Sequence, residues 1–167
     1  IGCSNLPSWQ VVESQWISKS MGLNRFVSCQ DEYNILNRNV EAELIPAMQK
    51  YGCGLLPYFP LASGLLTGKY KRTEMPEGAR LTDMPTFANR IYLTDENFDI
   101  VDNLNKFAHK TGHSILELAF GWMASRPTTA SIIAGATKPE QIDANVAAVN
   151  WVLSQSEIDE VNKISAR

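Results

Sequence analysis

The sequence alternates short apolar runs with longer segments of helical periodicity, and this alternation restricts the possible folds more than any other feature. The apolar runs are too short for helices, and each is followed by a polar or glycine-containing loop. They are Ile1–Ser4, Arg25–Gln30, Cys53–Tyr58 and Ser131–Gly135. Because a strand that rejoins its sheet in parallel needs a long crossover, usually a helix, the pattern predicts parallel β-α units.

The segments between the apolar runs predict helices. Ser8–Lys19 and Val40–Tyr51 place apolar residues at helical spacing and are expected to be crossover helices. Thr94 precedes two acidic residues and is expected to cap a helix that ends near Gly112. Three more helices are predicted from capping boxes, in which Ser or Thr is followed three residues later by Glu. The pairs are Ser114 with Glu117, Thr137 with Glu140, and Ser154 with Glu157.

The number of strand-helix units sets the expected fold. Four such units in 167 residues amount to half of an α/β (β/α)8 TIM barrel, which needs about 250 residues in all. A flavodoxin-like open sheet is the alternative architecture. The chain opens with Ile1 and not with methionine, in what reads as the end of a strand. We therefore expect residues 1–167 to be part of a longer, single barrel domain.

The segment Thr67–Leu93 has no clear periodicity and is predicted to be a long loop without secondary structure. It contains Pro76 and Pro85, and its basic residues follow directly after a predicted strand. These basic residues are Lys69, Lys71, Arg72, Arg80 and Arg90. Long loops of this kind are usually either functional or disordered, so we expect this one to belong to a binding site or to lack order.

Charge and composition exclude several classes of partner. The net charge is −3 and the basic residues are dispersed, which argues against nucleic acid and membrane surfaces as partners. No apolar run reaches the roughly 18 residues of a transmembrane helix, and no signal-peptide pattern is present, so we expect a cytoplasmic protein. Cys3, Cys29 and Cys53 are predicted to be buried free thiols. A helix-ending glycine separates His109 from His113, so no metal site is predicted.

Four motifs in this sequence resemble those of the aldo-keto reductase family, in the family's order and over nearly the whole chain. They are Gly2-Cys3-Ser4-Asn5, Gln30 with Tyr33-Asn34 and Arg38, Pro57–Tyr70, and Gly135–Gln141 with Asn145. In the family, such motifs follow the fifth, sixth, seventh and eighth strands of the barrel. The resemblance therefore implies that this chain is the C-terminal half of a TIM barrel, containing strands five to eight and their helices.

The resemblance also implies an NADP(H) site across the C-terminal ends of the strands. Ser4, Asn5 and Gln30 would hold the nicotinamide carboxamide, which needs both donors and acceptors. Tyr58 would stack on the nicotinamide ring. The pyrophosphate would lie against a turn where small side chains let backbone N–H groups approach. That turn contains Pro60, Leu61, Ala62 and Ser63.

The remaining contacts implied by the resemblance lie further along the chain. Lys69 and Arg80 would bind phosphate, including the 2′-phosphate of NADP. The ribose and adenine would meet the last motif, which lies at a helix N-terminus and contains Gly135, Ala136, Thr137, Gln141 and Asn145. Two positions depart from the family pattern. Phe59 replaces the usual serine after the stacking aromatic, and Ala144 replaces a frequent glutamate.

Taken without the resemblance, each of these residues has a simpler structural interpretation. Ser4-Asn5 suits a turn, and Thr137 suits a helix cap. Lys69 and Arg80 would then be solvated loop charges. The functional interpretation depends on all four motifs occurring together in the right order.

The resemblance implies an NADP(H)-dependent oxidoreductase that reduces aldehydes or ketones by hydride transfer. The family's catalytic tyrosine, lysine, aspartate and histidine belong to the first four strand-helix units, so no catalytic residue is assigned here. We expect the intact protein to be an enzyme and this chain alone to be inactive, with the N-terminal half of the barrel and a small carbonyl compound as partners. The alternatives are a non-catalytic NADP(H)-binding regulatory subunit and a half-barrel scaffold that forms homo-oligomers through its sheet edges.

Overall fold

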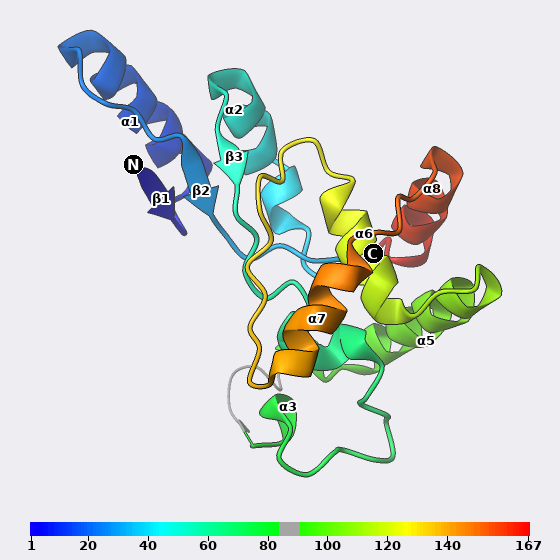
Figure 1. Ribbon diagram of the computed structural model, residues 1–167. Helices are drawn as coiled ribbons and strands as arrows, with labels where there is room; N and C mark the ends of the chain where they lie inside the picture. The colour runs from blue at the N-terminus through cyan, green and yellow to red at the C-terminus, as the bar shows by residue number, and fades with distance from the viewer. Residues whose placement is uncertain (84–90) are drawn as a thin grey trace.

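The computed structural model describes residues 1–83 and 91–167 and contains a small parallel sheet. The strands β1 (Gly2–Ser4), β2 (Ser28–Gln30) and β3 (Gly54–Leu55) lie in the order β1-β2-β3. Cys3 lies opposite Cys29 in the first pairing, and Cys29 lies opposite Leu55 in the second. Both pairings are parallel, which confirms the direction and order predicted for the first three strands (Figure 1).

The prediction of a fourth strand over Ser131–Gly135 is wrong. Instead, residues 128–130, which precede the predicted strand in the sequence, contact β3. They form two backbone hydrogen bonds with Leu55, of 2.7 and 2.8 Å, and one isolated parallel bridge. Contact resumes only where Ile133 N donates to Pro57 O at 2.9 Å. The segment therefore runs beside β3 in the expected direction, but its hydrogen bonds are too widely spaced to form a continuous ladder.

Helices α1 and α2 follow the first two strands and contact each other (Figure 1). α1 spans Ser8–Met21, and α2 spans Leu44–Tyr51. Each ends at a glycine with a φ of 65°, Gly22 and Gly52, in the left-handed conformation that glycine adopts without steric cost. The crossover positions predicted for both helices are therefore confirmed, although the second helix begins later than expected.

The helix predicted over Val40–Tyr51 is divided in the structure. Asn39–Glu41 form a short 3₁₀ helix, η1, and α2 begins only at Leu44. Pro46 explains the late start, because a proline ring clashes with the carbonyl four residues earlier and is tolerated only in the first helical turn. A helix from Val40 would have placed Pro46 in its second turn.

Three helices begin at caps that the sequence predicts. They are α5 (Asp95–Lys110), α6 (Ile115–Ala124) and α8 (Gln155–Ile164). Thr94 Oγ1 accepts a hydrogen bond from Asn97 N at 3.2 Å at the start of α5. The capping boxes at α6 and α8 are both formed, by Ser114 with Glu117 and by Ser154 with Glu157.

Replacing Ser114 by alanine should lower the free energy of unfolding by about 1 kcal/mol, the usual cost of losing an N-cap. Ser114 Oγ accepts from Glu117 N at 3.2 Å, and a Glu117 carboxylate oxygen accepts from Ser114 N at 2.8 Å. The bonds from Ser114 lower the pKa of Glu117, so this stabilisation is present at neutral pH and is lost as the pH falls through the lowered pKa. Urea unfolding checks the value, with exposed Ser20→Ala in α1 as the control. An unchanged midpoint for Ser114→Ala would contradict it.

The capping box predicted for Thr137 and Glu140 is wrong. α7 spans Pro139–Ala148 with Lys138 as its N-cap, and no side chain caps it. This start puts Gln141, and not Glu140, at the third helical position, where a capping side chain can reach back. Gln141 Oε1 accepts from Thr137 N at 2.7 Å and from Thr137 Oγ1 at 3.2 Å.

The loop predicted over Thr67–Leu93 contains a helical turn, contrary to expectation. After the 3₁₀ helix η2 (Ala62–Thr67), the chain forms α3 (Arg80–Asp83). Leu81 is fully buried, and its N–H donates to the Tyr70 hydroxyl at 3.0 Å. A single buried leucine in a polar segment has no periodicity that sequence analysis could detect. Two residues included in the prediction, Pro85 and Arg90, lie outside the described residues.

The core combines side chains from the sheet and the helices. The apolar faces of α5 and α6 are buried in it, and of the large side chains on these faces Phe107 is partly buried. Cys29 and Cys53 are buried and Cys3 is half-buried, and all three are free thiols as predicted. Within the described part of the chain, no helix is long and apolar enough to cross a membrane.

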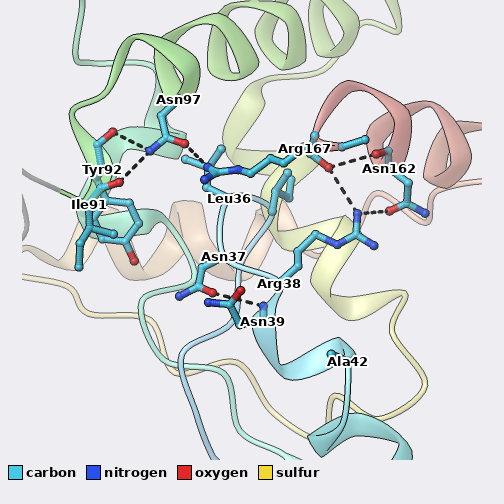
Figure 2. A pocket seen from close by; sticks show the side chains of 13 residues that line it. Leu36, Asn37, Arg38, Asn39, Ala42, Ile91, Tyr92, Asn97, Asn162 and Arg167 are labelled. Atoms are coloured by element: carbon cyan, nitrogen blue, oxygen red, sulfur yellow. Dashed lines mark hydrogen bonds between the residues drawn. The ribbon is translucent and has the colours of Figure 1, made fainter.

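A polar network connects α8 to the rest of the structure, and Figure 2 shows one of its bonds, between Arg38 and Asn162. Asn162 Oδ1 accepts hydrogen bonds from Arg126 at 2.8 Å, Arg38 at 3.0 Å and Trp122 Nε1 at 3.2 Å. Arg38 also forms an ion pair with Glu41 at 2.7 Å. Because one amide oxygen receives three donors from distant segments, Asn162 is the centre of this network.

Candidate functional site

A cluster of polar side chains lies where the strands end. Ser4 Oγ donates to Gln30 O at 2.8 Å, and Asn5 Nδ2 donates to Ser4 Oγ at 2.9 Å. The Tyr58 hydroxyl donates to Asn5 Oδ1 at 2.8 Å. The structure therefore brings together four residues that the sequence analysis singled out, from the ends of β1 and β2 and the segment that follows β3.

The backbone conformation of Asn5 allows this cluster to form. Its φ is 56°, in the left-handed region, which asparagine tolerates better than most residues. Asn5 N donates to Gln30 O at 3.3 Å, so the turn after β1 is tied to the end of β2. Ser4, Asn5 and the Gln30 amide still have donor and acceptor capacity beyond these bonds, as recognition of a carboxamide requires.

The environment of Tyr58 keeps its hydroxyl protonated. Burial raises the pKa of Tyr58, and the neighbouring carboxylates of Glu32 and Asp31 raise it further. The hydroxyl therefore acts as a hydrogen-bond donor at neutral pH, as its bond to Asn5 requires. Sequence analysis missed Asp31 and Glu32, which lie beside the predicted Gln30 and carried no motif signal of their own.

A cavity of about 850 Å³ lies next to this cluster and shares Tyr58 with it. Most of the other residues predicted to bind cofactor line the cavity. They are Pro60, Leu61, Ser63, Lys69, Arg80, Gly135, Ala136, Thr137, Gln141 and Asn145. Ala62 does not line it, since its side chain is fully buried. Lys138 also lines the cavity, although the sequence analysis gave it no role.

The turn from Phe59 to Gly64 forms one wall of the cavity. Its backbone has positive φ values at Phe59 (51°), Ala62 (48°), Ser63 (55°) and Gly64 (97°). Such conformations cost energy in residues other than glycine and are found mainly at functional sites. A side chain at Gly64 would approach Lys69 Cε to 3.2 Å, so glycine here lets the lysine lie against the turn.

The charges lining the cavity have one sign. Lys69, Arg80 and Lys138 contribute cations, and no aspartate or glutamate is among the described residues that line the cavity. Within residues 1–83 and 91–167, no salt bridge engages these three cations. By contrast, the nearby Arg72 is paired with Asp95 at 3.1 Å. The cavity therefore presents uncompensated positive charge, which suits an anionic ligand.

A second wall of the cavity includes the start of α7. A helix N-terminus carries partial positive charge and unpaired N–H groups, which favour anions. Thr137 and Lys138 precede this helix, and Gln141 and Asn145 lie within it. Both walls of the cavity therefore combine positive charge with hydrogen-bond donors.

A second cavity, of about 640 Å³, lies beside the network of Asn162 (Figure 2). None of the residues predicted to bind cofactor lines it. Its arginines are already engaged, since Arg38 pairs with Glu41 and Arg167 donates to Asn97. The first cavity is therefore the stronger candidate for ligand binding.

The fold and this cavity define an α/β protein with a site adapted to anions at the ends of its parallel strands. The sequence matches the Aldo/keto reductase family over residues 1–166, and the chain belongs to that family. The family has the α/β TIM barrel fold, typically uses a nicotinamide cofactor and acts on small carbonyl compounds.

Named relatives include both channel subunits and reductases. A probable voltage-gated potassium channel subunit beta of Oryza sativa subsp. japonica is 35% identical over 168 residues, covering 98% of this chain and 51% of the relative. The NADH-specific methylglyoxal reductase of Escherichia coli K12 is 36% identical over 132 residues, covering 77% and 38%. The L-glyceraldehyde 3-phosphate reductase of E. coli O157:H7 is 35% identical over 128 residues, covering 72% and 36%. The chain spans about half the length of the first relative and less of the other two.

Proposed function

We propose that this chain supplies the cofactor site of an NADP(H)-dependent oxidoreductase that reduces aldehydes or ketones. The single observation that carries the proposal is the cavity lined by Lys69, Arg80 and Lys138, with no carboxylate among its described lining residues. A dinucleotide with several phosphates matches both its charge and its volume of about 850 Å³. When bound, the cofactor would supply the hydride for carbonyl reduction.

The nicotinamide end of the cofactor would lie at the strand ends. Ser4, Asn5 and Gln30 would hold the carboxamide through their remaining donors and acceptors. The Tyr58 ring, whose hydroxyl is tied to Asn5, would provide the face on which the nicotinamide stacks. A fixed ring orientation would determine which face of the nicotinamide is turned toward the substrate.

The phosphates would lie in the cavity with uncompensated positive charge. The backbone N–H groups of the turn at Pro60–Ser63 would approach the pyrophosphate. The side chain of Ala62, within this turn, is buried. Lys69 and Arg80 would bind the 2′-phosphate. The N-terminus of α7 would hold the ribose and adenine side through Thr137, Gln141 and Asn145, with Gly135 and Ala136 beside them.

We also propose that residues 1–167 form the C-terminal half of one barrel domain, whose N-terminal half is a required partner. Both flanks of the structure expose large apolar side chains, as an incomplete barrel would. Ile1 in front of β1 is 73% exposed, and Val146 on α7 is 65% exposed. Apolar surface of this kind favours burial against another element.

The proposed 2′-phosphate contacts can be tested in the full-length protein by replacing Lys69 or Arg80 with methionine. Each change should weaken NADPH binding by about 1 to 3 kcal/mol, the range for charge-assisted hydrogen bonds, and barely affect NADH binding. Fluorescence titration with each dinucleotide measures both affinities. Lys71→Met and Arg72→Met are matched controls, because these residues pair with Glu74 and Asp95.

Equal losses for NADPH and NADH would show that these side chains do not distinguish the two cofactors. That outcome would leave NADH, the cofactor in the name of the E. coli methylglyoxal reductase, as an equal candidate.

A non-catalytic regulatory subunit is the second candidate function. It is favoured by the similarity to proteins named as potassium channel subunits, which covers 98% of this chain. Both functions require the same cofactor cavity, so cofactor binding does not separate them. Steady-state turnover of simple aldehydes by the full-length protein does, because a purely regulatory subunit would bind NADPH without measurable turnover.

A further inference from the structure

We propose that Phe59 is a positioning residue that holds the Arg80 guanidinium over the phosphate-binding cavity. The guanidinium carbon lies 5.0 Å from the centre of the Phe59 ring, and both residues line the cavity. This proposal rests on the proposed cofactor site and adds a determinant of its phosphate specificity. It also gives a function to a position where the usual serine of the family is missing.

The Phe59 ring has a defined position. The backbone carbonyl oxygen of Phe59 accepts hydrogen bonds from the buried Asn34 Nδ2 at 2.9 Å and from Ala62 N at 2.9 Å, which fixes the base of the side chain. The ring meets Tyr58 edge to face, with centroids 5.2 Å apart and an interplanar angle of 79°. An aromatic platform is therefore fixed between the stacking tyrosine and the arginine.

The backbone of Arg80 is also anchored. The adjacent Leu81 is fully buried and bonded to Tyr70, and Thr82 Oγ1 donates to Pro76 O at 2.8 Å. The Arg80 side chain itself is exposed. In the described part of the chain it forms no salt bridge, so the contact with Phe59 is the interaction that orients it.

An aromatic ring orients a guanidinium without neutralising it. A carboxylate partner would engage the N–H donors of Arg80 and cancel its charge, whereas a ring face attracts the cation and leaves its donors directed outward. A held arginine also loses less conformational entropy when a phosphate binds. A serine at position 59 would provide neither effect.

The test is a double-mutant cycle in the full-length protein with Phe59→Leu, Arg80→Met and both together. Phe59→Leu keeps apolar bulk at the strained turn but removes the aromatic face. It should weaken NADPH binding about two- to tenfold, from the usual strength of cation–π contacts, and leave NADH binding nearly unchanged. The double variant should bind NADPH no more weakly than Arg80→Met alone, and Phe59→Tyr should retain the affinity of the unaltered protein.

Two outcomes would overturn the proposal: losses that add fully in the double variant, or an equal loss for NADH and NADPH with Phe59→Leu. Either would mean that Phe59 acts through the packing of Tyr58 and not through Arg80.

If the unaltered protein binds neither dinucleotide, the proposed function itself fails. The contact between Phe59 and Arg80 is then tested by NMR of the protein without cofactor. The aromatic ring should shift the resonances of the Arg80 side-chain protons upfield, and Phe59→Leu should abolish that shift. Unshifted protons in the unaltered protein would overturn the pairing.

Discussion

Replacing Asn162 by leucine is expected to lower the free energy of unfolding of the full-length protein by about 2 to 4 kcal/mol. Asn162 Oδ1 accepts from Arg38, Arg126 and the Trp122 indole, and two of these donors are charged. Hydrogen bonds to charged groups contribute about 1.5 to 3 kcal/mol each, and a donor left unsatisfied adds its own cost. Leucine has the same number of side-chain heavy atoms as asparagine and the same branching at Cγ, so the change removes the acceptor and keeps the shape of the side chain.

The position of Arg126 makes this loss larger. Its guanidinium lies 4.0 Å from the centre of the Trp122 ring, and burial lowers its pKa, which shows that desolvation already disfavours the charge. Without Asn162, this cation would lose an acceptor that partly offsets that penalty. Urea unfolding measures the change, and the exposed neighbour Lys163→Ala is the control, expected to stay within about 0.5 kcal/mol. A midpoint for Asn162→Leu within error of the control would mean that the network is not stabilising.

Features set by neighbours in the sequence were predicted most accurately. The caps at Thr94, Ser114 and Ser154 are predicted correctly because the signal for each, acidic residues directly after Thr94 and a glutamate three residues after each serine, lies within one helical turn. Pro46 is also a local signal, because its position alone excludes a helix that starts at Val40. Local physical rules suffice for all of these features.

Features that depend on distant contacts were predicted less well. The run Ser131–Gly135 has strand composition, but whether it forms a ladder depends on its register with β3, which no local pattern specifies. The start of α7 differs by one residue from the prediction, and that shift transfers the bonding role from Glu140 to Gln141. An error of one residue at a helix end is small for the fold but decisive for the side chains involved.

The same distinction between local and long-range features applies to the candidate site. Sequence motifs singled out Ser4, Asn5, Gln30 and Tyr58, and the structure places them together at the strand ends. Their roles toward a cofactor remain predictions. That the described lining residues include no carboxylate could not be predicted from the sequence, because it depends on which residues lie near Lys69 and Arg80 in space.

The 167-residue chain on its own is expected to show no NADPH-dependent reduction of a reactive aldehyde. Carbonyl reduction needs a proton donor for the developing alkoxide, and losing such a donor typically lowers rates by about 10² to 10⁴. The tyrosines near the strand ends are poorly suited to this role. Burial raises the pKa of Tyr33, and its hydrogen bond to Glu41 raises it further. Burial likewise raises the pKa of Tyr92, and its hydrogen bond to Glu32 adds to the effect. Burial raises the pKa of Tyr58 as well, and its hydroxyl proton is already donated to Asn5.

The assay follows NADPH oxidation by a preparation whose folding is verified by circular dichroism and whose cofactor binding is verified by titration. A separately expressed polypeptide carrying the first four strand-helix units should restore turnover if the two halves dock through the apolar flanks at Ile1 and Val146. Replacing Val146 by a charged residue should abolish this restored turnover, because it would disrupt docking of the two halves and Val146 does not line the cofactor cavity. Turnover by the chain alone that disappears in Tyr58→Phe would identify Tyr58 as the acid, and the proposed division of the site between two halves would then be wrong.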